Sequence, residues 1–166
     1  MSADAPALAA FGAWTFRTAY GHLLDDAALD RYVSSHYTPD RQRQEIEAAD
    51  SVVLLAEASG ELVGFTLVCR GEAPASVTMP DAVNLARIYV NPSAQSSGVG
   101  RQLMRAAEAE ARGMGGSLLW LAVWEKNPRA VAFYRREGFT EIGRTGFPDD
   151  PDPECDLVMA KGLISC

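Results

Sequence analysis

The sequence has few of the residues that build metal sites and disulfide frameworks. It contains 3 cysteines and 2 histidines in 166 residues. They are Cys69, Cys155 and Cys166, with His22 and His36. An odd number of cysteines in a domain of ordinary size argues against a disulfide framework, and two scattered histidines do not make a zinc cluster. We therefore expect reduced thiols and no metal ion.

Long apolar runs are also missing. No segment approaches the roughly 18 consecutive apolar residues that a membrane helix requires. The opening MSADAPALAAFG lacks the charged region and apolar block of a signal peptide. We therefore expect a soluble, cytoplasmic protein.

Positive charge is the third shortage. The chain has 15 basic residues against 22 acidic ones, a formal net charge of −7. This is the wrong sign for a protein that binds nucleic-acid phosphates or anionic lipid, so we expect neither a nucleic-acid nor a membrane partner. The same sign favours cationic partners.

What the chain does have is apolar content for one core. At 48% hydrophobic residues, with no repeat, low-complexity tract or linker, residues 1–166 form a single predicted domain. Apolar spacing predicts helices over 11–20, 25–37 and 39–50. Two β-branched runs, 51–57 and 61–69, joined by a three-residue turn at 58–60, predict a hairpin.

The second half of the chain alternates strands and helices. After a proline-containing loop at 70–81, we expect a strand at 84–90, a helix from about 98 to 112, and a strand at 117–124. The last of these is apolar throughout, as in a central parallel strand covered on both faces, so the three make a right-handed βαβ unit. Asn127 and Pro128 begin a short helix that Gly138 ends, and the final strands lie at 138–147 and 154–161, around a turn-rich segment. The result is an α/β or α+β domain with a mixed sheet.

The segment QSSGVG, residues 95–100, lies between a strand and a helix, where phosphate-binding turns occur. A P-loop requires a lysine where Arg101 stands. A dinucleotide-binding fingerprint that began at Gly98 would require a glycine where Leu103 stands. Two interpretations remain: a plain turn into a helix, or backbone N–H groups that cradle a pyrophosphate, which the glycines allow to approach closely.

Two motifs within residues 84–139 resemble the GCN5-related N-acetyltransferase (GNAT) family. The first, Q-x-x-G-x-G, is formed by Gln95, Gly98 and Gly100. The second, N-x-x-A-x-x-F-Y-x-x-x-G-F, is formed by Asn127, Ala130, Phe133, Tyr134, Gly138 and Phe139. The resemblance implies a mixed, largely antiparallel sheet with a central parallel βαβ unit, flanked by helices. It also implies that strand 84–90 splays from strand 117–124, which admits the pantetheine arm of acetyl-CoA.

The same resemblance divides the domain into a helical substrate-side region, 1–50, and an acetyl-CoA-binding core, 84–139. It implies that the following residues bind the cofactor: Ile88, Tyr89, Val90, Gln95, Ser96, Ser97, Gly98, Val99, Gly100, Arg101, Asn127, Arg129, Ala130 and Tyr134. The amides of 97–101 would cradle the pyrophosphate, and the backbone of 88–90 would pair with the pantetheine arm. Tyr134 would be the general acid for the departing thiolate.

Two roles around the cofactor stay open. Asn127 fits either a helix cap or a cofactor contact. Lys126 and three arginines at positions 101, 105 and 129 are expected to supply the positive charge that coenzyme A requires in an acidic protein.

The resemblance extends to bacterial spermidine/spermine N-acetyltransferases, and the acidic composition suits such polycations. We therefore expect a primary amine acceptor, with a protein N-terminus or lysine, or a non-catalytic coenzyme A sensor, as alternatives. Many family members carry a glutamate near the start of strand 84–90, where this chain has Asn84. This leaves Glu57, Asp81 or an ordered water as the base. The exposed edges of a mixed sheet also allow a homodimer.

Overall fold

The computed structural model describes residues 4–146 and 156–163. The predicted turn segment 148–153, Cys155 and Cys166 lie outside this range. Three helices come first: α1 (Ala5–Tyr20), α2 (Asp26–His36) and α3 (Pro39–Glu47). The Asp25 carboxylate accepts the Ala28 N–H at 2.7 Å to cap α2, and the Thr38 hydroxyl accepts the Arg41 N–H at 3.1 Å to cap α3. All three predicted helices are confirmed, and α1 begins earlier than expected.

One six-stranded sheet follows, in the order β1-β2-β3-β4-β6-β5. Its strands are β1 (Ser51–Ala58), β2 (Glu61–Cys69), β3 (Val83–Val90), β4 (Leu118–Trp124), β5 (Thr140–Thr145) and β6 (Asp156–Gly162). Neighbouring strands run antiparallel except β3 and β4, which are parallel. The expected mixed sheet with one central parallel pair is therefore confirmed.

The β1–β2 hairpin is tighter than its sequence suggests. Ala58 pairs with Glu61, so the turn has two residues, Ser59 at φ 54° and Gly60 at φ 80°. Both lie in the left-handed region, as a primed two-residue turn requires. The prediction of a hairpin is confirmed, but Ala58 belongs to the strand.

The parallel pair opens almost as soon as it forms. β3 and β4 pair through Val83 with Leu119 and Asn84 with Trp120. On the other edge of β3, Leu67 faces Arg87 while Val68 faces Leu85, so Ala86 is an extra, bulged residue. A bulge bends its strand, and here it falls just beyond the last β3–β4 pair. The rest of β3 splays from β4, as the family resemblance implied.

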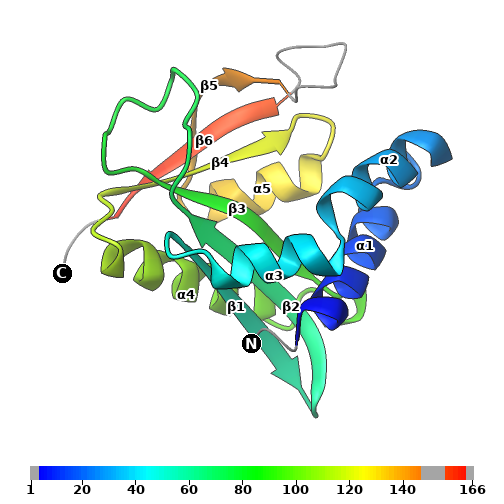
Figure 1. Ribbon diagram of the computed structural model, residues 1–166. Coiled ribbons are helices and arrows are strands. Elements are labelled where there is room, and N and C mark those ends of the chain that lie inside the picture. The colour runs from blue at the N-terminus through cyan, green and yellow to red at the C-terminus, as the bar shows by residue number, and fades with distance from the viewer. Residues whose placement is uncertain (1–3, 147–155, 164–166) are drawn as a thin grey trace.

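Helices cover both faces of the sheet (Figure 1). α4 (Val99–Gly113) and α5 (Pro128–Arg136) lie behind it in that view, over the largest buried cluster. We call this side the α4–α5 face. α1 and α3 pack on β1–β3 from the opposite side, which we call the α1–α3 face. The loop 70–82 covers β4 and β6 on that same side, where Val77 packs near Trp120 and Val158.

Further features bear on the expectations from composition. No helix in the described residues is long and apolar enough to cross a membrane. Cys69 is a free, half-buried thiol at the end of β2, and burial raises its pKa.

Candidate active site

The turn before α4 leaves backbone N–H groups pointing outward. Gly98 is the N-cap of α4 with φ 91°, and Ser96 also has a positive φ, 72°. No side chain caps this helix within the described residues. The Ser97 N–H bonds the Ala94 carbonyl at 3.3 Å, whereas the first amides of a helix have no intrahelical acceptor. The amides from Gly98 to Arg101 therefore lie at the positive end of the α4 dipole, an arrangement that suits an anion.

Gly100 is a glycine that the fold itself does not need. A Cβ atom added there would lie 3.5 Å from the Phe133 ring and 3.7 Å from Val90, ordinary contact distances. Its φ is not positive, and alanine is the better helix former. The fold would therefore accept a side chain at this position, and its absence leaves the backbone open to close approach.

The splayed edge of β3 continues from this turn. The Asn91 N–H donates to Val63 of β2 at 2.8 Å. N–H groups alternate between the two edges of a strand. Since the Asn91 N–H faces β2, the N–H groups of Val90 and Ile88 face the opposite edge, which β4 has left. The Gln95 amide reaches back to donate to the Val90 carbonyl at 3.2 Å. Gln95 thus ties the turn before α4, residues 95–98, which we call the phosphate turn, to the end of this open edge.

Tyr134 of α5 is held by its neighbours' rings. Its ring lies 5.5 Å from Phe133 and 5.9 Å from Phe139, both in edge-to-face geometry. Burial raises the pKa of Tyr134 well above its usual range, and the nearby Tyr20 adds to the rise. The hydroxyl therefore stays protonated at neutral pH and can donate a hydrogen bond.

Asn127 uses both ends of its amide within the protein. Its Oδ1 accepts the Ala130 N–H at 3.2 Å, which caps α5, and its Nδ2 donates to the Tyr20 hydroxyl at 3.2 Å. The predicted cap is confirmed. The second bond joins the end of α1 to the start of the helix that carries Tyr134.

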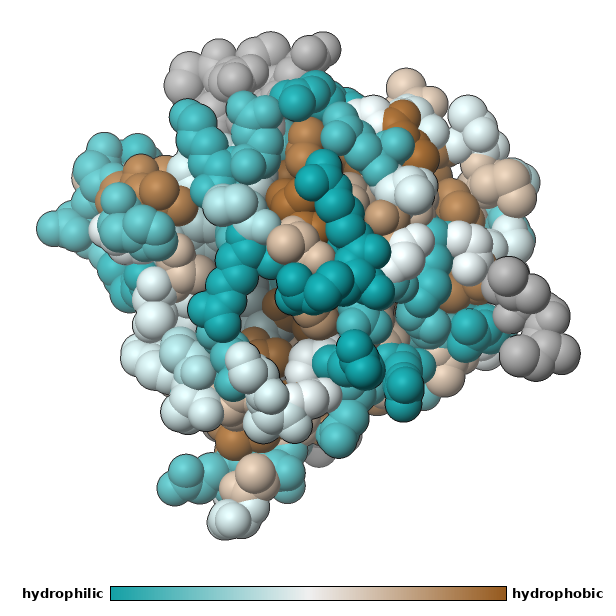
Figure 2. Space-filling model, turned by 180° about the vertical axis from the view of Figure 1, so that it is seen from behind, coloured by the Kyte–Doolittle hydropathy of each residue, from teal (hydrophilic) through white to brown (hydrophobic). Residues whose placement is uncertain are grey.

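Among the predicted cationic residues, Arg101 and Arg105 belong to α4, Arg129 belongs to α5, and Lys126 precedes α5, so both helices of the α4–α5 face carry some of them. Arg101, Arg105, Arg129 and Lys126 are exposed. Arg101 pairs with Glu137 across the two helices at 3.4 Å, and the Lys126 ammonium lies 5.7 Å from the Trp124 ring centre. Figure 2 shows this face as mostly hydrophilic, with hydrophobic residues visible between polar ones near its middle.

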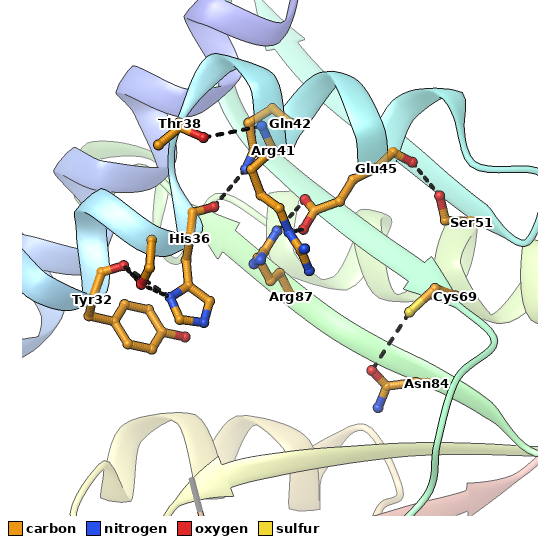
Figure 3. A network of polar contacts seen from close by, with 11 residues as sticks. Tyr32, His36, Thr38, Arg41, Gln42, Glu45, Ser51, Cys69, Asn84 and Arg87 are labelled. Carbon is orange, nitrogen blue, oxygen red and sulfur yellow. Dashed lines mark hydrogen bonds and ion pairs between the residues drawn. The ribbon is translucent and has the colours of Figure 1, made fainter. Parts of the chain in front are cut away.

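The α1–α3 face is organised around a buried ion pair (Figure 3). Arg87, just after the bulge, donates to Glu45 of α3 at 2.5 Å, and Arg41 donates to the same carboxylate at 2.9 Å. Burial lowers the pKa of Arg87, but the hydrogen bond and charge of Glu45 outweigh it, so the net pKa is raised. The guanidinium also lies over the Tyr37 ring at 5.4 Å. This network fixes α3 to the splayed strand.

Aromatic side chains fill the space between these helices and β3. The Tyr37 hydroxyl donates to that of Tyr89 at 2.7 Å, and Tyr32 stacks on Phe16 at 4.2 Å. Burial raises the pKa of Tyr32 to about 12. The Tyr89 side chain packs under α1 and α2, and its backbone N–H, two residues before that of Asn91, faces β2 rather than the open edge.

Neither carboxylate suggested as a base lies beside the open edge of β3. Asp81 accepts the Ser117 hydroxyl at 2.9 Å, and at about 3.3 Å per residue it is roughly 20 Å along the strand from Ile88. Glu57 is exposed on β1, which β2 separates from β3. A general base requires hydrogen-bond reach or one bridging water, and neither carboxylate meets this requirement at the open edge.

Sequence reasoning missed Tyr20 and Asp156. Tyr20 contacts Asn127 and lies 5.9 Å from the Trp124 ring. Asp156, the first residue of β6, is 2% exposed and pairs with Trp124 across the strands. A buried aspartate at the start of an apolar strand is a signal, but nothing local shows what it faces. Among the described residues, no three His, Cys, Asp or Glu side chains are grouped to hold a metal ion.

Comparison with known proteins places this geometry in context. Residues 18–139 match the family model described as acetyltransferase (GNAT) family. An uncharacterized N-acetyltransferase of Lactobacillus delbrueckii subsp. lactis is 28% identical over 97% of this chain and 93% of its own length. The IAA acetyltransferase of Azospirillum brasilense is 32% identical over 81% of this chain and 86% of its own. The PaiA N-acetyltransferase of Thermoplasma acidophilum, solved with coenzyme A, superposes with a TM-score of 0.80 at 19% identity, over 97% and 94% of the two chains.

Proposed function

The chain belongs to the GNAT family of N-acetyltransferases, which use acetyl-CoA, and we propose that it acetylates a small primary amine by direct attack, a polyamine such as spermidine or spermine. The observation that carries the proposal is the splay between β3 and β4. It begins after Asn84 and extends along β3 to the phosphate turn. An extended cofactor arm fits such an opening, with its reactive end toward Tyr134.

The N-terminus of α4 suits a pyrophosphate. The amides from Gly98 to Arg101 supply donors and the positive end of the helix dipole. Gly100 allows close approach, while the exposed Arg101 and Arg129 supply charge that the net-negative protein otherwise lacks.

The edge of β3 suits the pantetheine arm. The pantetheine amides would pair with Ile88 and Val90 as a further strand does, so backbone hydrogen bonds would fix the position of the acyl group. The Val90 N–H would also polarise the acyl carbonyl as it develops negative charge.

Acetyl-CoA supplies the thioester that the amine attacks, and Tyr134 acts on the sulfur that departs. Reference pKa values near 10 for tyrosine and 8.5 for a thiol make full proton transfer uphill by about 2 kcal/mol. Because burial raises the pKa of Tyr134 further, transfer of the proton before the sulfur develops charge is even less favourable. We infer that Tyr134 stabilises the thiolate by a hydrogen bond and releases its proton late.

A charged acceptor is supported by electrostatics. The chain has a net charge of −7, and a field of this sign raises the local concentration of cations. An amine attacks as the neutral base, so its ammonium form must lose a proton, and an ordered water is the acceptor that the geometry favours.

Thiol release from acetyl-CoA with a panel of amines tests the proposal. The panel contains spermidine, spermine, simple monoamines, amino acids and a short peptide with a free N-terminus. We expect the highest kcat/KM with the polyamines. Preference for the peptide would replace the polyamine with a protein acceptor. Tight coenzyme A binding by calorimetry without release on any amine would indicate a sensor.

A further inference from the structure

A buried threonine interrupts the apolar run of β2. Thr66 is 0% exposed, and burying a hydroxyl is unfavourable unless it has a hydrogen-bond partner. That partner lies in the next strand, because the Thr66 hydroxyl donates to the backbone carbonyl of Arg87 in β3 at 2.9 Å. In the register of the two strands Arg87 pairs with Leu67, so this side-chain bond is additional to the backbone pairing.

The carbonyl that Thr66 holds belongs to the same peptide unit as the Ile88 N–H. A trans peptide unit is planar, so its C=O and N–H point in opposite directions, and none of the described peptide bonds is cis. Since the Arg87 carbonyl points toward Thr66 of β2, the Ile88 N–H points toward the edge that β4 has left. The Asn91 N–H, which faces β2, gives the same direction independently.

One edge of this peptide unit has no strand to hold it. In an interior strand, hydrogen bonds from the neighbours on both sides fix the plane of each peptide. β3 pairs with β4 only at Val83 and Asn84, so beyond Asn84 only β2 can fix it. The peptide also comes directly after the bulged Ala86, where the pairing is disrupted. The Thr66 hydroxyl supplies an additional bond from the side that remains.

Arg87 is anchored at its side chain as well. Its guanidinium donates to Glu45 at 2.5 Å and lies 5.4 Å from the centre of the Tyr37 ring. Both contacts are on the α1–α3 face, whereas the next residue, Ile88, packs against the core under α4 and α5. The side-chain contacts fix the position of Arg87, and the bond from Thr66 fixes the direction of the peptide that follows it.

Resting on the proposed cofactor site, we propose that Thr66 is a positioning residue: its hydroxyl holds the peptide between Arg87 and Ile88 so that the Ile88 N–H stays on the open edge, where it pairs with the pantetheine arm of acetyl-CoA. Thr66 acts through this peptide and not by contact with the cofactor. Because the arm carries the acyl group, the bond contributes both to cofactor affinity and to the alignment of the thioester.

The test compares Thr66→Val, which keeps the shape of the side chain and removes the hydroxyl, with Thr66→Ser, which keeps the hydroxyl. Thr66→Val should weaken coenzyme A binding about fivefold, within the range of one hydrogen bond. It should also lower kcat about tenfold, because the acyl group loses alignment. Thr66→Ser should restore both values to near wild type. Binding of 3′-phospho-ADP, the part of coenzyme A without the pantetheine arm, should be equal in all three proteins.

Thr15→Val is the matched control. Thr15 of α1 is also a buried threonine, 5% exposed, and its hydroxyl donates to the Phe11 carbonyl at 2.9 Å. The same change there removes a buried hydroxyl of the same kind on the α1–α3 face, so it should leave coenzyme A affinity and kcat unchanged. Thermal unfolding of both valine variants compares the stability that each one loses.

Hydrogen exchange of two amides in the wild-type protein requires no variant. The Ile88 N–H should exchange fast in the free protein and slow by about tenfold or more when coenzyme A binds. The Tyr89 N–H faces β2 and should be protected in both states. An Ile88 amide as protected as that of Tyr89 before coenzyme A is added would overturn the inference.

The outcomes separate the two proposals. A loss of coenzyme A affinity in Thr66→Val with 3′-phospho-ADP affinity kept, but without thiol release on any amine, supports the positioning role and defeats the proposed acetylation. Thiol release with coenzyme A affinity and kcat unchanged in Thr66→Val defeats the positioning role alone. Equal losses of coenzyme A and 3′-phospho-ADP affinity, or equal losses in Thr15→Val, make Thr66 a structural residue and also defeat the positioning role.

Discussion

The two faces of the sheet are built from different parts of the chain. In the proposed cofactor site, the donors are backbone amides of one short stretch, from Ile88 to Arg101, shaped by a bulge and two glycines. On the α1–α3 face, the contacts join side chains from separate segments, such as Tyr37, Glu45 and Arg87. A backbone site constrains the spacing of glycines, while a side-chain site depends on how distant segments pack.

Tyr134→Phe should produce the largest effect, because it removes the hydroxyl that we propose acts on the departing sulfur. The phenylalanine ring keeps the contacts with Phe133 and Phe139. We expect kcat to fall about 100-fold or more, the range of general acid catalysis, with coenzyme A affinity within about twofold of wild type. Steady-state kinetics and calorimetry check this. An unchanged kcat would remove Tyr134 from the chemistry.

Gly100→Ala should lower coenzyme A affinity without lowering the stability of the fold, which would separate the proposed backbone site from the packing of the helix. Packing tolerates the methyl group and alanine favours the helix, so the free energy of unfolding should stay equal or rise by up to about 1 kcal/mol. Coenzyme A affinity should fall about tenfold, because the Cβ atom meets the bound diphosphate. Gly113→Ala is the matched control: it is in the same helix with open space around it, and should change stability alone. Equal affinity in the two variants would refute the role of Gly100.

Tyr20→Phe tests whether the hydrogen bond from Asn127 joins α1 to α5. It removes the acceptor of the Asn127 Nδ2 bond, which should cost about 1 kcal/mol in the free energy of unfolding. Asn127→Ser keeps a capping oxygen but loses that donor. In a double-mutant cycle measured by denaturant unfolding, we expect the two losses to be less than additive. Full additivity would mean that the bond contributes nothing.

The smallest expected effect is a change in tyrosine ionisation between the folded and unfolded protein, and measuring it requires no mutation. All 5 tyrosines of the chain have pKa values raised by burial, Tyr32 to about 12. An unfolded tyrosine ionises near pH 10. The stability that these groups contribute is therefore complete below about pH 10 and is lost as pH rises through the folded values. Absorbance titration should show little tyrosinate at pH 10 in the native protein and about half ionisation in denaturant.

Much of the fold could be predicted because its signals are local. Apolar spacing and capping residues such as Thr38 and Asn127 determine helices in their own neighbourhood. The central strand β4 was identifiable from its unbroken apolar run. The hairpin turn was predicted one residue too long. A two-residue turn requires Ser59 to adopt a positive φ, which a serine in the sequence does not indicate.

The site divides in the same way. The turn into α4 could be predicted because the glycine spacing and the helix that follows lie in one stretch of sequence. The partners of Arg87 and Asn127 could not, because Glu45 and Tyr20 are 42 and 107 residues away and meet them only after folding. Asp81 and Glu57 looked plausible as bases from the sequence alone, but strand geometry sets them apart from the open edge of β3.

The most direct measurement is an amide-resolved NMR titration of the protein with coenzyme A. If main-chain donors at the start of α4 hold the diphosphate, the resonances of Gly98, Val99, Gly100 and Arg101 should shift most, followed by those of Ile88 and Val90. Large shifts confined to other parts of the chain, with these amides unmoved, would contradict the account.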